Sequence, residues 1–304
     1  MYVWKMEFTI YIIRKMNHIV NMACGLANRM FQYSYYLLLK EKGYNPKVDF
    51  YSSGKLSHEN VVWNKIFPNA YYQQATQQEV KQLGGGKGLW SRFLRRFFPK
   101  FTHCLQMPTA FDASLPKMNQ SQYILGVFQN AKMVESVGSK IKEVFTFADI
   151  EGENNLQFIQ QFQNEESVAI HVRKGADYSQ RIWYQNTCLP EYYTKAIEEI
   201  KKRISNPHFY VFTDNKEWVK EHFKNFEYTL IEGNPISGWG SHFDMQLMTL
   251  CKHNIISNST YSWWGAFLNR NENKIVICPK IWFNPQSTPE YNSDKLLCEN
   301  WISI

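Results

Sequence analysis

The sequence predicts an α/β protein with two Rossmann-like domains, each built around a parallel sheet. Three observations favour this fold class. The 304 residues are enough for two domains of about 150 residues each. Hydrophobic residues make up 44% of the chain, which is ample for two cores. Short apolar runs with the period of a strand alternate with longer segments that have the period of a helix, and this alternation is typical of doubly wound parallel sheets.

The first domain is expected to begin with a strand, a turn of small residues and a helix. Residues 1–16 mix apolar and charged side chains and are interpreted as an N-terminal extension, with neither a signal peptide nor a membrane span. Residues 17–22 have the pattern of a strand, residues 23–28 form the turn, and the helix that follows ends at Gly43. In an α/β unit, a turn at this position usually lies next to a ligand.

The first domain is predicted to extend from residue 17 to residue 160 and to contain one unusual helix. Strands are expected at 47–51 and 123–129. Between them, residues 87–100 interleave aromatic and basic side chains, so a helix there would have an apolar side and a basic side. Three interpretations are open: packing on the core, contact with an anionic membrane surface, and nucleic-acid binding. Little else in the chain favours nucleic acid, and no nucleic-acid partner is predicted.

The second domain, residues 161–304, has the clearest alternation of strands and helices. Pro190 is in the favoured first position of a helix whose apolar residues form one face. Strands are expected at 168–172, 208–212, 228–232, 254–257 and 274–278, and helices at 190–204, 218–223, 243–252 and from 263 onward.

Polar side chains follow several of these strands. His171 and Arg173 share one face of the first strand, Asp214 follows the second, and residues 258–260 follow the fourth. In parallel sheets, ligands bind beyond the carboxyl ends of the strands. An arginine can bind a phosphate through paired N–H groups, and hydroxyls before a helix can do the same. A salt-bridged strand end and simple N-capping explain each motif taken alone; the motifs together favour an anionic ligand.

Charge and cysteine usage narrow the classes of function. The net charge of +7 indicates an anionic partner. The six cysteines are widely spaced and contain no C-x-x-C pair, which favours reduced thiols in a cytosolic protein over a disulfide framework or a zinc ribbon. The sequence contains no H-E-x-x-H or D-x-D motif, so no metal is predicted. A bound diphosphate would then be neutralised by arginine, lysine and helix N-termini.

Three motifs make the chain resemble a known family. Residues 244–266, DMQLMTLCKHNIISNSTYSWWGA, closely resemble the signature of bacterial α1,2-fucosyltransferases, glycosyltransferase family 11. Residues 171–178, HVRKGADY, resemble the family's H-x-R-R-G-D-Y motif, and residues 25–33, GLANRMFQY, resemble its G-L-G-N-Q-M-F-Q-Y. The resemblance covers roughly residues 17–283. The chain departs from the family in the glycines and glutamine of the first loop, and in one extra residue before Asp177.

The resemblance implies a GT-B-like architecture and an inverting galactoside 2-α-L-fucosyltransferase. The enzyme would move L-fucose from GDP-fucose to the 2-hydroxyl of a β-galactoside, with no cofactor. Its acceptor would be a galactose-terminated oligosaccharide or a lipid-linked glycan in surface polysaccharide biosynthesis. The protein is expected in the cytoplasm, where residues 87–100 would make a peripheral contact with the cytoplasmic face of the inner membrane. Two alternatives are another GDP-sugar or fucosyl linkage on the same fold, and a non-catalytic nucleotide- or glycan-binding module.

The resemblance also implies roles for individual residues. Arg173 would bind the diphosphate and assist the departure of the leaving group. Asp177 would be the catalytic base, for which the phosphate of the leaving GDP is the alternative. Asp244 would accept hydrogen bonds from the N–H groups of guanine. The other residues expected to hold the nucleotide sugar are Asn28, Arg29, His171, Asp214, Asn258, Ser259 and Thr260.

Overall fold

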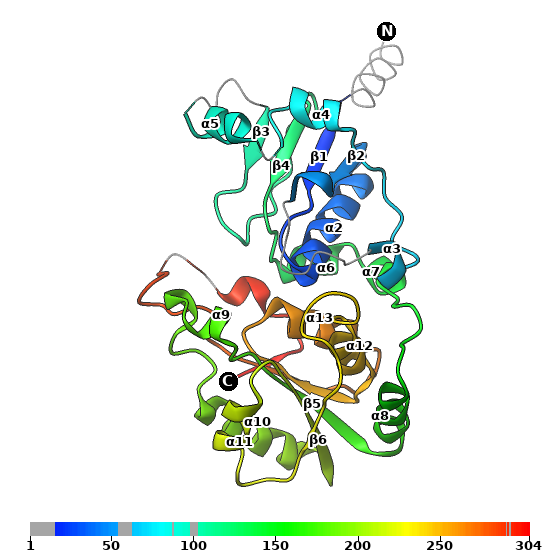
Figure 1. Cartoon of the computed structure of the whole chain (residues 1–304), viewed down its shortest axis with the longest axis vertical. Coiled ribbons are helices and arrows are strands. Elements are labelled where there is room, and N and C mark those ends of the chain that lie inside the picture. Colours follow the sequence, from blue (N-terminus) through cyan, green and yellow to red (C-terminus); the bar gives the residue numbers. More distant parts are fainter. Residues whose placement is uncertain (1–15, 54–62, 87, 98–102, 290, 292) are drawn as a thin grey trace. The chain divides into compact units, whose positions relative to one another are not determined.

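The structure is a computed structural model that describes residues 16–53, 63–86, 88–97, 103–289, 291 and 293–304 (Figure 1). The predicted N-terminal extension, apart from Met16, therefore lies outside the described residues. The chain divides into two compact units, Met1–Glu59 with Pro68–Val144 and Asn60–Phe67 with Phe145–Ile304. The division after Val144 lies before the expected boundary at residue 160. The reason is that α8 (Glu153–Asn164) packs against a strand and a helix of the second unit.

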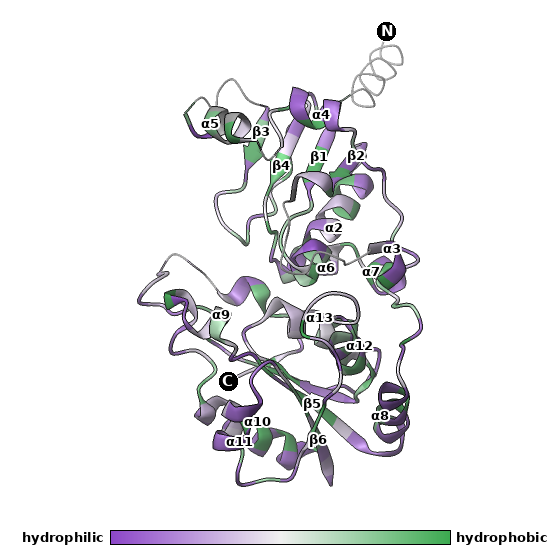
Figure 2. Cartoon of the chain, in the orientation of Figure 1, coloured by the Kyte–Doolittle hydropathy of each residue, from purple (hydrophilic) through white to green (hydrophobic). Residues whose placement is uncertain are grey.

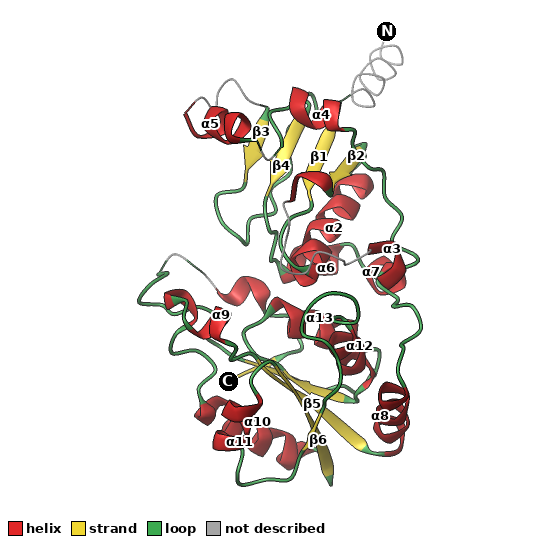
Figure 3. Ribbon diagram, viewed as in Figure 1, coloured by secondary structure: helices red, strands yellow, loops and turns green. Residues whose placement is uncertain are grey.

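Unit 1 contains a four-stranded parallel sheet with the strand order β2-β1-β4-β3 (Figure 3). The strands are β1 (His18–Asn21), β2 (Pro46–Asp49), β3 (Cys104–Gln106) and β4 (Gln122–Leu125). Helix α2 (Leu26–Glu41) packs against β1 and β2 and buries a row of apolar side chains, among them Met30 and Phe31. The predicted strand, turn and helix at the start of this domain are confirmed.

Short helices complete unit 1. They are η1 (Tyr51–Ser53), α4 (Gln77–Gln82), α5 (Leu89–Phe97), α6 (Ala131–Ser136) and α7 (Lys140–Val144). Helix α4 begins with a capping box, in which the Thr76 hydroxyl accepts from the Glu79 N–H and the Glu79 carboxylate accepts from the Thr76 N–H. Helix α6 packs on α2. Helix α5 is drawn beside β3, which is an edge strand of the sheet.

Unit 2 contains a six-stranded parallel sheet with the strand order β10-β9-β8-β5-β6-β7. All five predicted strands of this domain are present, and the short β10 pairs with β9 in addition. The strands are β5 (Glu166–Val172), β6 (Pro207–Thr213), β7 (Thr229–Leu230), β8 (His253–Ile255), β9 (Val276–Cys278) and β10 (Ile302–Ser303).

The helices of unit 2 cover this sheet. Besides α8 they are α3 (Trp63–Ile66), α9 (Ala176–Ser179), η3 (Ile182–Tyr184), α10 (Pro190–Arg203), α11 (Lys216–His222), α12 (Phe243–Leu250), α13 (Thr260–Leu268) and η4 (Ser293–Leu296). The apolar face predicted for α10 is buried against Val168, Ile170 and Val172 of β5. This core fixes β5, from whose end the first polar motif extends.

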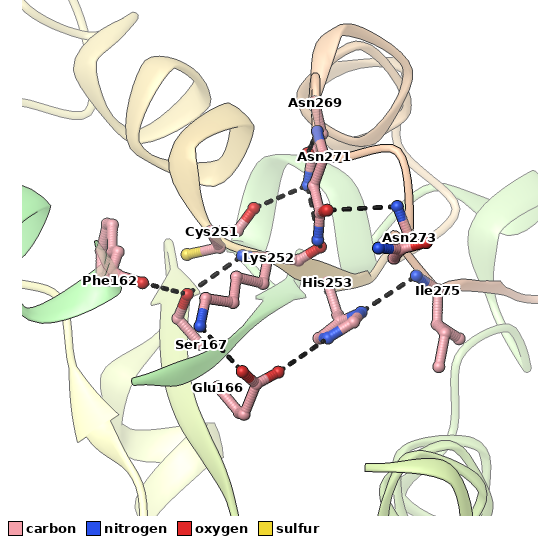
Figure 4. A network of polar contacts seen from close by, with 10 residues as sticks. All are labelled: Phe162, Glu166, Ser167, Cys251, Lys252, His253, Asn269, Asn271, Asn273 and Ile275. Carbon is pink, nitrogen blue, oxygen red and sulfur yellow. Dashed lines mark hydrogen bonds and ion pairs between the residues drawn. The ribbon is translucent and has the colours of Figure 1, made fainter. Parts of the chain in front are cut away.

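The amino ends of β5 and β8 are joined by a polar network (Figure 4). The Ser167 hydroxyl donates to the Phe162 carbonyl (3.0 Å) and accepts from the Lys252 N–H (3.0 Å). The Lys252 ammonium pairs with Glu166 at 2.8 Å, and His253 Nδ1 accepts from the Ile275 N–H at 3.0 Å. Because these groups are paired with one another at the end of the sheet opposite the predicted site, their role is structural.

Candidate functional site

His171 is buried at the end of β5. Its Nδ1 lies 2.9 Å from the Ser257 hydroxyl, and its carbonyl accepts from the Tyr193 hydroxyl at 3.2 Å. Burial, and then the charge of Arg173, lower the pKa of His171 to about 3. The imidazole is therefore neutral at neutral pH. His171 anchors the strand end to the segment after β8 and brings no positive charge to an anion.

Arg173 follows β5 and forms an ion pair with Asp214, which follows β6. The other carboxylate oxygen of Asp214 accepts from the Lys174 N–H at 2.7 Å. The guanidinium carbon of Arg173 also lies 5.2 Å from the centre of the Tyr178 ring. Arg173 and Asp214 are thus brought together as expected, and the carboxylate sets the direction of the guanidinium.

Lys174 is next to Arg173 in sequence but faces the interior. Its ammonium donates to the Thr187 carbonyl at 2.9 Å and lies 5.4 Å from the centre of the Trp218 ring. Burial lowers the pKa of Lys174. This lysine ties the segment after α9 to the end of β5, a role that the sequence analysis did not assign.

Asn258 is buried, and it contacts the loop segments that contain Thr187 and Trp282. Its side-chain amide donates to the Thr187 hydroxyl (2.9 Å) and to the Trp282 carbonyl (2.8 Å). Its backbone N–H donates to Cys188 Sγ at 3.3 Å, and its carbonyl accepts from the Tyr178 hydroxyl at 2.5 Å. Both amide hydrogens are therefore engaged within the protein. Asn258 holds the loops around Arg173, and a contact of this residue with the nucleotide stays a prediction.

The segment after β8 enters α13 through Ser259. The Ser259 hydroxyl accepts from the Tyr261 N–H at 3.3 Å, and the Ser259 carbonyl accepts from the Trp263 N–H at 3.0 Å. Ser259 is thus the N-cap of α13, as the N-capping interpretation of residues 258–260 predicted. Thr260 is the first residue of the nine-residue helix. The positive end of the helix dipole lies here, which is a favourable position for an anion.

Asp244 lies in the first turn of α12, and it is half-buried. One carboxylate oxygen accepts from the Asn234 side-chain amide at 2.8 Å. Asn234 and Asn155 exchange two amide hydrogen bonds of 3.0 Å each. Burial raises the pKa of Asp244, and the hydrogen bond from Asn234 opposes that shift. The sequence analysis missed both asparagines because nothing near them marks a motif.

One tyrosine links the start of α12 to the start of α13. The Tyr261 hydroxyl accepts from the Met245 N–H at 2.8 Å and donates to the Ser241 carbonyl at 2.7 Å. The ring of Tyr261 lies 5.7 Å from that of His171. Asp244 and the cap of α13 therefore belong to one hydrogen-bonded framework at the carboxyl end of the sheet.

A pocket of about 490 Å³ opens beside Asn234. It is lined by residues 151–155, residues 232–235 and Phe243. Its carboxylates come from Glu151, Glu153 and Glu232, of which Glu232 pairs with Lys216 and Glu151 accepts from the Trp239 indole N–H at 3.3 Å. The lining is rich in hydrogen-bond acceptors, so the pocket suits a ligand whose edge carries N–H donors.

The predicted residues of unit 1 lie at the start of α2. Asn28 Oδ1 accepts from the Gln129 side-chain amide at 3.0 Å. The guanidinium carbon of Arg29 lies 5.8 Å from the centre of the Phe50 ring, and burial lowers the pKa of Arg29. Cys24, in the preceding turn, has a positive φ of 67°. The turn is therefore shaped without a glycine at that position.

Asp177 lies within α9, and its side chain is outside the part of the chain that the structure describes. Its role as a base stays a prediction. Among the described residues, no group of three or more His, Cys, Asp and Glu side chains is arranged to hold a metal ion. No helix in the described part of the chain is long and apolar enough to cross a bilayer.

Comparisons with known sequences identify related proteins. The model of glycosyl transferase family 11 matches residues 89–304. An α-1,2-colitosyltransferase of Escherichia coli is 30% identical over 94% of this chain and 98% of its own length. The O-antigen biosynthesis glycosyltransferase WbnK of Escherichia coli is 32% identical over 60% of each chain. A mouse galactoside α-(1,2)-fucosyltransferase 2 is 30% identical over 33% of this chain and 30% of its own.

Comparisons with solved structures confirm the fold class. The fucosyltransferase NodZ from Bradyrhizobium aligns with a TM-score of 0.51 and 12% identity, over 83% of this chain and 93% of that chain. NodZ α-1,6-fucosyltransferase co-crystallised with GDP gives a TM-score of 0.50 at 13% identity, over 83% and 92%. The predicted α/β architecture with two parallel sheets, of the GT-B-like kind, is confirmed.

Proposed function

The chain belongs to glycosyl transferase family 11, and from this membership we propose that it is an inverting α1,2-fucosyltransferase that uses GDP-fucose. The sugar would be transferred to the 2-hydroxyl of a β-galactoside. The observation that carries the proposal is the arrangement of Arg173, paired with Asp214, at the same sheet end as Asp244 and the first turn of α13. This arrangement offers groups for a diphosphate and for a base with N–H donors.

Arg173 and α13 would bind the diphosphate. A guanidinium can hold two phosphate oxygens at once, and each charge-assisted contact contributes about 1.5–3 kcal/mol. The first turn of α13 adds the positive end of its dipole. Both groups interact more strongly as negative charge develops on the leaving GDP, so they would lower the barrier to cleavage of the sugar–phosphate bond.

Asp244 and the pocket beside Asn234 would select guanine. Guanine presents N1–H and an exocyclic amino group as donors on one edge, whereas adenine has an acceptor at N1. An acceptor-rich pocket with Glu151 and Glu232 in its lining therefore favours guanine. The structural neighbour NodZ, which was co-crystallised with GDP, supports the same nucleotide.

Inversion in a single displacement requires a base for the acceptor hydroxyl. We assign this role to Asp177, which follows Arg173 in the motif that resembles the family. We further propose that no metal is required, because Arg173 and the α13 terminus are the groups offered to the diphosphate. Full activity in excess EDTA is the expected result, and dependence on an added divalent cation would contradict it.

The cellular role follows from the relatives. WbnK is named for O-antigen biosynthesis, so we propose that this enzyme builds a surface polysaccharide in the cytoplasm. The acceptor would be a galactose-terminated oligosaccharide or a lipid-linked glycan. A colitosyl transfer is the second candidate, because the α-1,2-colitosyltransferase is 30% identical over 98% of its length. Colitose is fucose without the 3-hydroxyl, so the two donors share every other group.

One experiment separates these possibilities. The full chain is incubated with GDP-fucose or GDP-colitose and a panel of β-galactosides, and released GDP and the linkage of the product are measured. An α-linked fucose on O2 is the expected result. Preference for GDP-colitose would support the second candidate, and transfer to another position would indicate a different linkage. Tight binding of GDP without turnover on any acceptor would instead indicate a binding module. Arg173→Ala should abolish transfer, whereas Arg203→Ala, in an exposed ion pair on α10, should not.

A further inference from the structure

Helix α5 (Leu89–Phe97) of unit 1 combines hydrophobic and hydrophilic residues (Figures 1 and 2). Three of its large apolar side chains are exposed to solvent. Leu89 is 84% exposed, Phe93 42% and Phe97 60%. These residues are four positions apart, so they lie on one face of the helix. The interpretation that the apolar side of this segment packs on the core is therefore wrong for Phe93 and Phe97.

The three exposed residues lie along one side of the helix. The rings of Phe93 and Phe97 contact each other with their centres 4.8 Å apart, and Leu89 lies one turn earlier on the same side. Single exposed apolar residues are ordinary on protein surfaces, but a row of three along one helix indicates an interaction site.

The charge of the helix indicates which kind of surface it meets. Arg92, Arg95 and Arg96 fall within α5, and the helix contains no acidic residue. The guanidinium carbon of Arg96 lies 5.8 Å from the centre of the Phe97 ring, so positive charge is directly next to the apolar face. An apolar row with Arg96 beside it, on a helix whose charged residues are all arginines, complements a bilayer with anionic headgroups, which attract cations and accept apolar side chains below them.

We propose that α5 is a membrane-binding helix that lies in the interface of an anionic bilayer. Leu89, Phe93 and Phe97 insert between the lipids, and Arg96 contacts the headgroups. The helix is nine residues long, so it lies on the membrane and does not cross it. This inference does not depend on the donor or the acceptor of the reaction. Of the three interpretations of residues 87–100, the exposed face of α5 favours the membrane surface over nucleic acid; residues 87 and 98–100 lie outside the described residues.

The test is co-sedimentation of the full chain with vesicles of phosphatidylglycerol and phosphatidylethanolamine, or of phosphatidylcholine alone. We expect binding to the anionic vesicles that is at least tenfold stronger than binding to the zwitterionic ones. Raising the salt concentration from 0.15 M to 0.5 M should weaken binding to the anionic vesicles, because salt screens the attraction between the arginines and the headgroups. Equal binding to both kinds of vesicle, or to neither, would overturn the proposal.

Two sets of variants assign the binding to α5. Changing Leu89, Phe93 and Phe97 together to serine should weaken binding to anionic vesicles at least tenfold. The matched control changes three exposed apolar residues outside α5 to serine, Tyr71, Leu156 and Leu250, and should bind as the parent chain does. Equal losses in the two triple variants would contradict the assignment to α5.

A charge variant and four further measurements complete the test. Changing Arg92, Arg95 and Arg96 to glutamine should remove the preference for anionic lipid. Circular dichroism and GDP binding, which α5 should not affect, verify that each variant is folded. Binding to single-stranded DNA or RNA in place of vesicles would overturn the lipid assignment. Self-association that the serine variant abolishes, without any vesicle binding, would also overturn it.

Discussion

Replacing Asn258 with alanine should destabilise unit 2 without removing any charge from the site. The substitution deletes the amide that donates to the Thr187 hydroxyl and the Trp282 carbonyl. The backbone contacts of residue 258 with Cys188 and Tyr178 can persist, because they use its N–H and C=O groups. The effect therefore isolates the side-chain amide.

The size of the effect follows from burial. Each of the two hydrogen bonds contributes about 0.5–1.5 kcal/mol, and a buried polar group left without a partner costs about 1–3 kcal/mol. The Trp282 carbonyl is such a group after the substitution. We therefore expect the free energy of unfolding to fall by about 2–4 kcal/mol. Asn258→Asp should lose at least as much, since a carboxylate cannot donate to a carbonyl.

Two measurements test this reasoning. Denaturant unfolding followed by tryptophan fluorescence gives the change in stability. Hydrogen exchange followed by mass spectrometry shows whether residues 176–188, which the amide helps to hold, open more easily. Asn164→Ala, at an exposed position at the end of α8, is the control and should change neither. A loss below about 0.5 kcal/mol for Asn258→Ala, with unchanged exchange of residues 176–188, would refute the role of Asn258 as the centre of the loop contacts.

Three further predictions concern the charged and titratable groups. Asp214→Asn should weaken GDP binding severalfold, because Asp214 no longer sets the direction of Arg173. Arg173→Lys should weaken GDP binding more, because a lysine cannot form paired contacts with a phosphate. If calorimetry gave both variants the affinity of the parent, the ion pair would not be a positioning device. The pKa of His171 is about 3 in the folded chain and about 6.5 in the unfolded chain. Between these values the unfolded state binds one more proton, so the free energy of unfolding decreases as the pH falls below 6.5. The expected decrease at pH 5 is about 2 kcal/mol. Unfolding at pH 7.5 and pH 5 checks this, and His171→Asn should reduce the difference between the two. Asp244→Asn should lower the preference for GDP over ADP in competition binding about tenfold or more, because the amide presents a donor to guanine; an unchanged preference would remove Asp244 from base recognition.

The alternation of apolar segments was sufficient to predict the fold, because a parallel sheet covered by helices leaves a strong periodic signal. Strands β3 and β10 were not predicted, because their short segments carry no such pattern and their pairing depends on neighbours far away in the sequence. The same limit applies to the site. The sequence placed Arg173, Asp214 and Ser259 at strand ends, but hydrogen-bond partners such as Asn234 are determined only when the chain is folded.

The two motifs that carried the family resemblance in unit 2 contact each other in the structure. His171 lies against Ser257, and the Tyr178 hydroxyl donates to the carbonyl of Asn258, so the first motif binds the middle of the second. This explains how one extra residue in the first motif is tolerated. Ala176 begins α9, and Tyr178, which comes after the extra residue, still reaches Asn258 and stacks at 3.8 Å on Tyr184. The backbone around Arg173 therefore remains tied to the start of α13, where the diphosphate would bind.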